Sequence, residues 1–319
     1  MHYLTPMTMN RATKIYAFLT VGLTTVLLFA AYAFQDEDPT GRPAPRTAAA
    51  PTAGLSQRVE SIPLRDAYDF AGEALPIDNF DVAERLDREL MTNSYWHSST
   101  LQLIKLAHRY FPVIEPILAK NGVPDDFKYL AVAESGLRNV TSPAGAKGFW
   151  QFMPATGREY DLEINREVDE RYHLEKATQA ACEYLLDKYR RTNSWITTAA
   201  MYNAGEARIN GYLNEMRADH YFDLNLGEET ARYVFRLVAM KEILRDPEHF
   251  GFYVPEADRY APLTDFSTVT VTESIDNLGD FAKQYGTSYR MLKVYNPWLV
   301  ESSLPISSGN SYEIRVPKD

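Results

Sequence analysis

Hydrophobic residues between about residues 80 and 250 recur with the period of an α-helix. One such segment runs from Leu101 to Leu118 and is ended by Asn121-Gly122. The next opens at Pro124, with two carboxylates in its first turn. Glycine and proline are concentrated between the helical segments, as residues that end helices should be. The pattern therefore predicts a mainly α-helical lobe, with three further helices over 178–189, 194–202 and 228–244.

After Pro255 the pattern changes from helical to alternating. Residues 266–272 read FSTVTVT, with β-branched side chains at alternate positions, and residues 312–316 read YEIRV, which alternates again. Two short helical stretches lie between them, over 278–285 and 288–295. The order strand, helix, helix, strand within about 50 residues predicts a small separate βααβ module.

The N-terminal segment has the pattern of an export signal. Residues 15–34 carry no charge, follow two basic residues and precede three acidic ones. The run is long enough to cross a bilayer, yet Ala31-Tyr32-Ala33 also fits a signal cleavage site. A cleaved signal and a retained membrane anchor therefore both stay open. Either way, we expect the rest of the chain on the periplasmic side of the cell envelope.

Composition shifts suggest where the parts of the chain begin and end. Residues 35–60 are rich in proline, alanine and threonine and have no means of burying a core, which indicates a linker. We expect four parts: an export signal or anchor over 1–34, a linker over 35–79, a helical catalytic domain over 80–255 and the βααβ module over 266–317.

Charge and cysteine content narrow the possible functions. The 319 residues include 33 Lys and Arg against 43 Asp and Glu, a formal charge of −10. Because there is no basic excess to neutralise phosphates, nucleic acid is not expected as a partner. The single cysteine, Cys182, excludes an intramolecular disulfide and a multi-cysteine zinc site. The 21 tyrosines exceed the 15 phenylalanines and suggest amphipathic grooves.

Glu134 occupies an unusual position for an acid. It lies on the same face of its predicted helix as Phe127, Leu130 and Ala131, where an ionised carboxylate loses hydration. Gly136 ends that helix, so Glu134 falls in the last turn, where the helix dipole also disfavours a negative charge. Both effects favour a protonated carboxyl group, which a general acid requires. The alternative is a buried glutamate paired with an arginine, or one that turns into water.

Residues 141–156, TSPAGAKGFWQFMPAT, form a candidate substrate loop. Gly145 and Gly148 allow the backbone conformations that other residues rarely adopt. Phe149, Trp150 and Phe152 flank Gln151. Exposed aromatic rings beside an amide would suit a sugar, whose C–H faces stack and whose hydroxyls form hydrogen bonds. The alternative is an ordinary loop held by aromatic side chains in the core.

Four motifs then occur in order: Glu134-Ser135, GFWQFMPATG from 148, MYNAG from 201 and ETARYV from 229. Together they resemble the motif series of family 23 glycoside hydrolases, the lytic transglycosylases with a goose-lysozyme-like fold, and in particular the membrane-bound D-type. The resemblance covers about residues 85–250. It implies a lysozyme-like, all-helical catalytic domain.

The resemblance also implies the roles of individual residues. Glu134 would be the catalytic acid and base, and Ser135 would assist it by hydrogen bonding. The sequence departs from the family pattern at Phe149-Trp150, where the family has Leu-Met, and at Met201, where it has Ala. The implied substrate-binding residues are Ser135, Gly148, Gln151, Tyr202, Asn203 and Tyr233.

The implied reaction cleaves the β-1,4 bond between N-acetylmuramic acid and N-acetylglucosamine in peptidoglycan and leaves 1,6-anhydromuramyl ends. One carboxylate acts first as acid and then as base, so no second catalytic acid is needed, unlike in two-carboxylate hydrolysis. Arg166 occupies the place of the turn glycine of a calcium loop, and we expect no metal and no cofactor. We interpret the neighbouring acids as a solvated segment: Asp161, Glu163, Glu167 and Asp169.

Residues 267–317 resemble a lysin-motif (LysM) domain, through VTVTESIDNLGDFAKQYGTSYRMLKVYNP and the closing strand YEIRVP. Such domains bind glycans that contain N-acetylglucosamine, so the expected partners are peptidoglycan glycan strands. A module that only packs against the helical lobe is the alternative. For the whole chain, a lysozyme-like hydrolase (muramidase) and a catalytically inert peptidoglycan-binding scaffold stay open as rival functions.

Overall fold

The computed structural model describes residues 60–318. The predicted export signal or anchor and most of the predicted linker lie outside them. Within this part, no helix combines the length and hydrophobicity that crossing a membrane requires. One compact unit begins at Glu60. It includes a short antiparallel hairpin, β1 (Asp69–Phe70) and β2 (Glu73–Ala74), which inserts the fully buried Phe70 into the main core.

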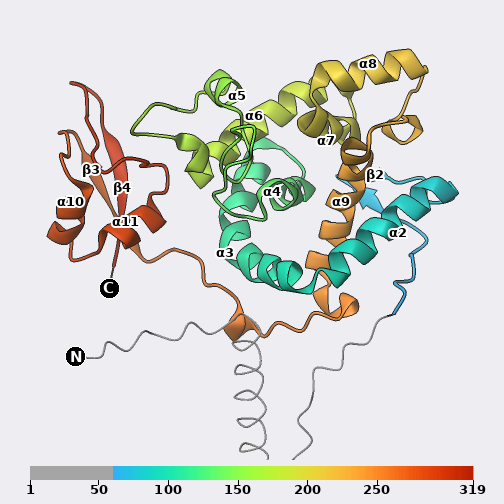
Figure 1. The fold of residues 1–319 in the computed structure, drawn as a ribbon, viewed down its shortest axis with the longest axis horizontal. Coiled ribbons are helices and arrows are strands. Elements are labelled where there is room, and N and C mark those ends of the chain that lie inside the picture. The colour runs from blue at the N-terminus through green and yellow to red at the C-terminus, as the bar shows by residue number, and fades with distance from the viewer. Residues whose placement is uncertain (1–59, 319) are drawn as a thin grey trace, which may run out of the picture. The chain divides into compact units, whose positions relative to one another are not determined.

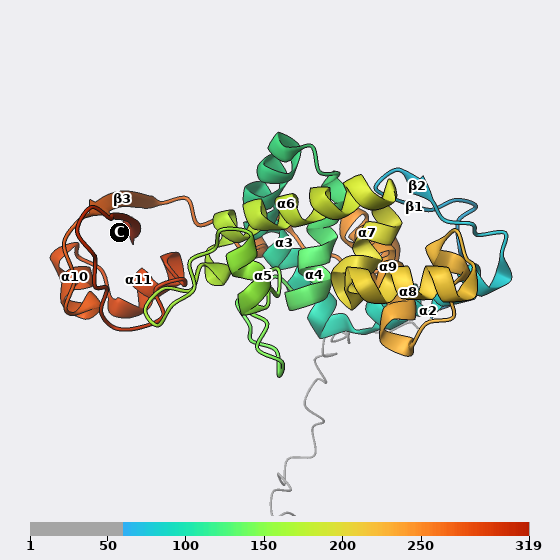
Figure 2. The same ribbon diagram turned by 90° about the horizontal axis from the view of Figure 1, so that it is seen from above.

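Eight α-helices of the described chain form the main lobe (Figure 1, Figure 2). They are α2 (Phe80–Tyr95), α3 (His97–Asn121), α4 (Lys128–Ser135), α5 (Pro154–Glu159), α6 (Leu174–Thr192), α7 (Trp195–Ala204), α8 (Glu206–Met216) and α9 (Glu228–Arg245). Five short 3-10 turns lie between or after them, at Asp125–Phe127, Glu170–Tyr172, Tyr221–Asp223, Pro247–Phe250 and Glu256–Asp258.

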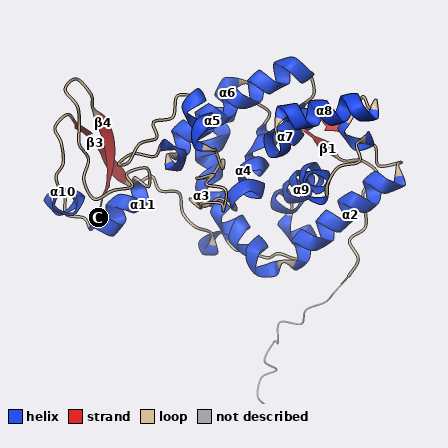
Figure 3. Cartoon of the chain, turned by 45° about the horizontal axis from the view of Figure 1, so that its top comes forward, coloured by secondary structure: helices blue, strands red, loops and turns tan. Residues whose placement is uncertain are grey.

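The helices predicted from hydrophobic periodicity are confirmed as α3, α4, α6, α7 and α9, and with them the mainly α fold class. α9 is the central helix and packs against α2, α4 and α7. Figure 3 shows α9 nearly end-on between them. Residues 233–243 of α9 are buried except for Arg236. Apart from Lys241 and Glu242, the buried side chains of this stretch are apolar or aromatic, as expected for a helix that lies in a core.

The C-terminal module has the predicted βααβ order. Its elements are β3 (Phe266–Val271), α10 (Leu278–Gln284), α11 (Tyr289–Tyr295) and β4 (Tyr312–Pro317). The two strands pair antiparallel, with Phe266 opposite Pro317 and Val271 opposite Tyr312. Asn277 and Ser288 cap the two helices by accepting hydrogen bonds from backbone N–H groups of the first turns.

The module packs against the segment that follows α5 in the main lobe. Val168 of the lobe belongs to the module's own hydrophobic core. The backbone N–H of Asp169 donates to the carbonyl of Trp298 at 2.9 Å, and the N–H of Val300 donates to the carbonyl of Glu167 at 2.9 Å. These contacts hold residues 167–169 along the module as a short extended stretch.

Side chains add two polar links between the same parts. The hydroxyl of Tyr312 donates to Glu163 Oε1 at 2.8 Å, and Arg315 forms an ion pair with Glu175 at 2.6 Å. The interpretation of residues 161–169 as a solvated acidic segment is therefore wrong for Asp169, which is 3% exposed. The physical reason is that Arg171 and Lys147 contact this carboxylate directly, while the backbone N–H of Asp169 is bonded to the module.

Candidate active site

Glu134 lies in the last turn of α4, as predicted. Gly136 caps the helix in the left-handed region, at a φ of 61°, and its N–H donates to the carbonyl of Val132. The face that carries Phe127 and Leu130 is fully buried, and Glu134 itself is half-buried at the end of that face. The hydroxyl of Tyr233, from the middle of the buried helix α9, donates to Glu134 Oε1 at 2.6 Å.

The surroundings of Glu134 favour its neutral form. Burial raises the pKa of the carboxyl group above its usual value, and the charge of Glu229 adds to the rise. The Tyr233 hydrogen bond and the charge of Arg236 oppose this shift without cancelling it. Among the described residues Glu134 forms no ion pair, because Arg236 instead pairs with Glu89 and Glu229. The carboxyl group is thus a proton donor without a cationic partner.

Two phenols accompany the acid. Tyr233 is fully buried, and Tyr202 lies in the last turn of α7 with its hydroxyl donating to the carbonyl of Trp150 at 2.6 Å. Burial raises the pKa of both phenols well above the ordinary value, and the nearby charge of Glu134 adds to the effect. Both therefore remain protonated donors. Asn203, next to Tyr202, is half-buried and forms no side-chain hydrogen bond within the described chain.

Gly148 and Gln151 shape the backbone of the loop between α4 and α5. Gly148 has a φ of 80°, and a Cβ atom there would lie 1.8 Å from the carbonyl oxygen of Arg171. No other residue fits this approach without moving the backbone. Gln151, at a φ of 50°, donates from Nε2 to the carbonyls of Gly148 and Val140, at 2.7 and 3.2 Å. Both residues thus fix the loop from within.

The prediction that this loop exposes its aromatic rings is wrong, and the alternative, a loop held by aromatic side chains in the core, is confirmed. Phe149, Trp150 and Phe152 are 3%, 0% and 3% exposed. The indole N–H of Trp150 donates to the hydroxyl of Thr178 at 2.9 Å, so its burial leaves no polar group unpaired. The physical reason is the large apolar area of these rings, which is stabilised by burial.

Ser135 is placed next to the acid but is bonded to its own helix. Its hydroxyl donates to the carbonyl of Ala131 at 2.9 Å and accepts from the N–H of Arg138 at 3.4 Å. Glu134, Tyr202 and Tyr233 thus come together through α4, α7 and α9. Gly148 and Gln151 support the loop whose Trp150 carbonyl holds Tyr202.

Sequence reasoning missed the buried pair that braces this loop. Arg171, 3% exposed, donates from Nε and Nη2 to the carboxylate of Asp169 at 2.8 and 2.7 Å. Its Nη1 donates to the carbonyls of Gly145 and Phe152, both at 3.1 Å. Burial alone would raise the pKa of Asp169, but the contacts with Arg171 and Lys147 lower it below its usual value. The available signal was an acid and an arginine two residues apart, at positions 169 and 171.

Comparison with known proteins identifies both parts of the chain. Residues 111–224 match the family described as transglycosylase SLT domain. Residues 267–319 match the soluble lytic transglycosylase C-terminal LysM-like domain. The chain contains an SLT domain and a LysM-like domain. Glu134, Tyr202 and the loop around Gly148 all lie inside the matched part of the SLT domain.

One curated relative is the membrane-bound lytic murein transglycosylase D of Escherichia coli K12, which is 30% identical over 266 residues. The match includes 79% of this chain and 56% of the relative, so the chain spans little more than half of that protein. Two solved structures are also similar. The 70 kDa soluble lytic transglycosylase of Escherichia coli has a TM-score of 0.38 and 23% identity, over 44% of this chain and 24% of that one. An inactive mutant of the Pseudomonas aeruginosa transglycosylase Slt has a TM-score of 0.37 and 19% identity, over 47% and 26%.

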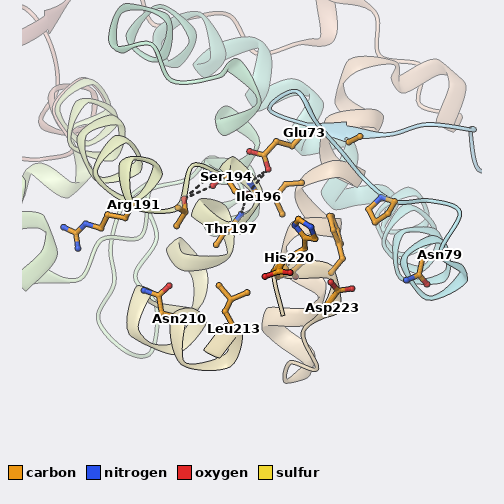
Figure 4. A pocket seen from close by; sticks show the side chains of 16 residues that line it. Glu73, Asn79, Arg191, Ser194, Ile196, Thr197, Asn210, Leu213, His220 and Asp223 are labelled. Atoms are coloured by element: carbon orange, nitrogen blue, oxygen red, sulfur yellow. Dashed lines mark hydrogen bonds between the residues drawn. The ribbon is translucent and has the colours of Figure 1, made fainter. Parts of the chain in front are cut away.

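The main lobe also contains a cavity of about 560 Å³ that includes none of the predicted site residues (Figure 4). Glu73 lies at its upper edge, where it accepts hydrogen bonds from the Ser194 hydroxyl at 2.8 Å and the Ile196 N–H at 3.2 Å. The cavity thus lies at the first turn of α7, at the opposite end of that helix from Tyr202. Asn210 and His220 also line it.

Proposed function

We propose that this protein is a peptidoglycan lytic transglycosylase. It would cleave the β-1,4 bond between N-acetylmuramic acid and N-acetylglucosamine and form 1,6-anhydromuramyl ends, with Glu134 as both acid and base. The observation that carries the proposal is the state of Glu134, a carboxyl group with a raised pKa whose hydrogen-bond partner is the neutral phenol of Tyr233. The SLT domain match and the murein transglycosylase relative support the same reaction class.

The proposed reaction begins with the protonated Glu134. Its Oε1 accepts from Tyr233, whereas Oε2 has no hydrogen-bond partner in the described part of the chain, so Oε2 is free to meet substrate. The proton passes to the leaving glycosidic oxygen as the bond to the muramyl C1 breaks. The muramyl N-acetyl oxygen stabilises the positive C1. The Glu134 carboxylate then removes the proton of the C6 hydroxyl, whose oxygen closes the 1,6-anhydro ring on C1.

The remaining candidate residues divide by what they contact. Tyr233 positions the carboxyl group of Glu134, and Tyr202 links α7 to the Trp150 carbonyl. Asn203, with its amide uncommitted, is proposed to bind substrate directly, whereas Ser135 is proposed to assist Glu134 by hydrogen bonding once substrate is present. The loop residues Gly148 and Gln151 keep the substrate side of this loop in place.

The proposed partners are peptidoglycan glycan strands, bound by a catalytic domain over 80–255 and a LysM-like domain over 266–317. We place the protein at the periplasmic side of the cell envelope, and at a membrane if residues 15–34 are retained as an anchor. The name of the curated relative, a membrane-bound murein transglycosylase, supports this placement.

Digestion of purified sacculi followed by mass spectrometry tests the proposal. The wild-type chain should release muropeptides with 1,6-anhydro ends, and Glu134→Gln should release none. Glu159→Gln, at an exposed position on α5, is the matched control and should behave as wild type. Reducing ends would instead identify a muramidase. A chain that pelleted with sacculi but yielded the same products with and without Glu134 would be an inert scaffold.

A further inference from the structure

A second cavity, of about 270 Å³, lies between the SLT domain and the LysM-like domain. Both domains belong to the compact unit that begins at Glu60. Its wall is mostly aromatic and comes from elements far apart in the sequence. The SLT domain and the segment before α6 contribute Tyr110, Phe149 and Tyr172, and the LysM-like domain contributes Phe266, Tyr295 and Trp298.

The rings of this wall are held in place by contacts with one another. Tyr110 meets Phe149 edge-on at 4.7 Å between ring centres, and Phe266 meets Tyr295 in the same way at 6.0 Å. Tyr110 and Tyr295 are partly exposed, and neither hydroxyl has a hydrogen-bond partner in the described structure. The cavity therefore offers preformed apolar surface together with two uncommitted phenol groups.

Charged and amide groups surround the aromatic wall. Arg315 pairs with Glu175 at 2.6 Å while its guanidinium lies 4.8 Å over the ring of Phe266. Arg109 donates from Nε to the carbonyl of Ala261 at 2.9 Å, and Asn139 lies on the same rim. A wholly apolar ligand would cover the hydroxyls of Tyr110 and Tyr295 without giving them a hydrogen-bond partner, and the volume is too small for a helix or a folded partner.

We infer that this cavity is a second glycan-binding site, which takes one N-acetylhexosamine residue of a β-1,4-linked glycan. A pyranose ring has apolar C–H faces that match aromatic rings and hydroxyls that match phenol, guanidinium and amide groups. One sugar residue is also the size of ligand that a cavity of this volume accepts. The inference rests on the proposed function in one respect, since it adds a second contact with the same class of substrate.

The cavity lies directly behind the active-site loop, so a sugar bound there would affect how the two domains are held together. Phe149 in its wall directly precedes Trp150, whose carbonyl accepts the hydrogen bond of Tyr202. A bound sugar would touch both domains at once and would fix the LysM-like domain against the back of the active-site loop. It would hold a glycan strand independently of the bond being cleaved, so binding at this site and cleavage at Glu134 are separable.

Titration calorimetry with the neutral trimer of N-acetylglucosamine tests the inference. The titrated protein is the full chain carrying Glu134→Gln, so that no cleavage interferes. In that background, Tyr295→Ala should weaken trimer binding at one site about tenfold, because a stacked ring is lost. Tyr295→Phe, which keeps the ring, should retain most of the affinity. Thr264→Trp, which fills the exposed rim of the cavity, should block the same site without removing any packed side chain.

Tyr285→Ala is the matched control, because Tyr285 is 44% exposed on the LysM-like domain but does not line the cavity. Trimer binding that is insensitive to both Tyr295→Ala and Thr264→Trp, or that is lost in Tyr285→Ala instead, would overturn the inference. Sacculus digestion by the chain with Glu134 intact, measured separately, keeps the two proposals distinct. Trimer binding that depends on Tyr295, in a chain that releases no anhydro ends, would refute the proposed function and leave this site standing.

Discussion

Two acids of this protein lose water on folding, and they respond in opposite ways. At Glu134 burial prevails and the pKa rises, because the hydrogen-bond partner is a neutral phenol and the nearby arginine is occupied elsewhere. At Asp169 burial is overcome and the pKa falls, because Arg171 and Lys147 contact the carboxylate directly. Burial alone therefore does not mark a catalytic acid. What distinguishes Glu134, the proposed catalytic acid, is burial without a cation, which leaves a proton available for transfer.

The largest expected effect separates activity from stability at Glu134. Glu134→Gln removes the only proposed acid and base, so kcat/KM on glycan strands should fall about 10²–10⁴-fold. Stability should stay the same or rise, because the amide can still accept from Tyr233 and no longer carries a cost of ionisation in a desolvated place. Product release and urea unfolding measured on the same preparation check both parts. A loss of activity that came with a comparable loss of folding would contradict this account of Glu134.

The second prediction reverses the pattern at Asp169. Asp169→Asn leaves the buried guanidinium of Arg171 uncompensated and should destabilise the protein by about 3–5 kcal/mol in urea unfolding. Arg171 also donates to the loop carbonyls of Gly145 and Phe152. Activity should therefore fall only to the extent that the substitution makes this loop more mobile. The double variant with Arg171→Met should recover part of the stability, since it leaves no buried charge. Equal losses in the single and the double variant would show that the pair does not act as a unit.

The difference between these two acids also shows what the sequence could reveal. Glu134 was predictable because its position is local: a helical period, a terminating glycine and the helix dipole all act within one helix. The two strands and two helices of the module were also predictable, because each is indicated by a pattern within its own short segment. Asp169 was not, because the backbone around it is fixed by hydrogen bonds with the distant module, such as that between its own N–H and the carbonyl of Trp298. The aromatic loop was misjudged because a ring's burial depends on the facing helix, as with Trp150 and Thr178.

A smaller effect is expected from the phenol that touches the acid. The Tyr233 hydrogen bond stabilises the ionised form of Glu134, so Tyr233→Phe should raise the pKa of Glu134 further. Activity needs the protonated acid and is lost as the pH rises through this pKa, so the alkaline limb of the pH–rate profile should move to higher pH. The loss of positioning should lower kcat about tenfold. Tyr160→Phe is the control, because Tyr160 follows α5 and forms no hydrogen bond with Glu134, and it should leave the profile in place. A limb that moved to lower pH in Tyr233→Phe would refute this role.

The smallest effect concerns an acid that lies between the two extremes, at the contact between the domains. Burial would raise the pKa of Glu175, but the close contacts with His173 and Arg315 lower it from 4.5 to about 2. Because the folded-state pKa is depressed, the stabilisation is present above pH 4.5 and is lost as the pH falls toward 2. The pair is partly exposed, so Glu175→Gln should cost no more than about 1 kcal/mol at neutral pH. The free energies of unfolding of the variant and the wild type should converge on acidification. A difference that persisted at pH 2 would mean that Glu175 acts through packing rather than through its charge.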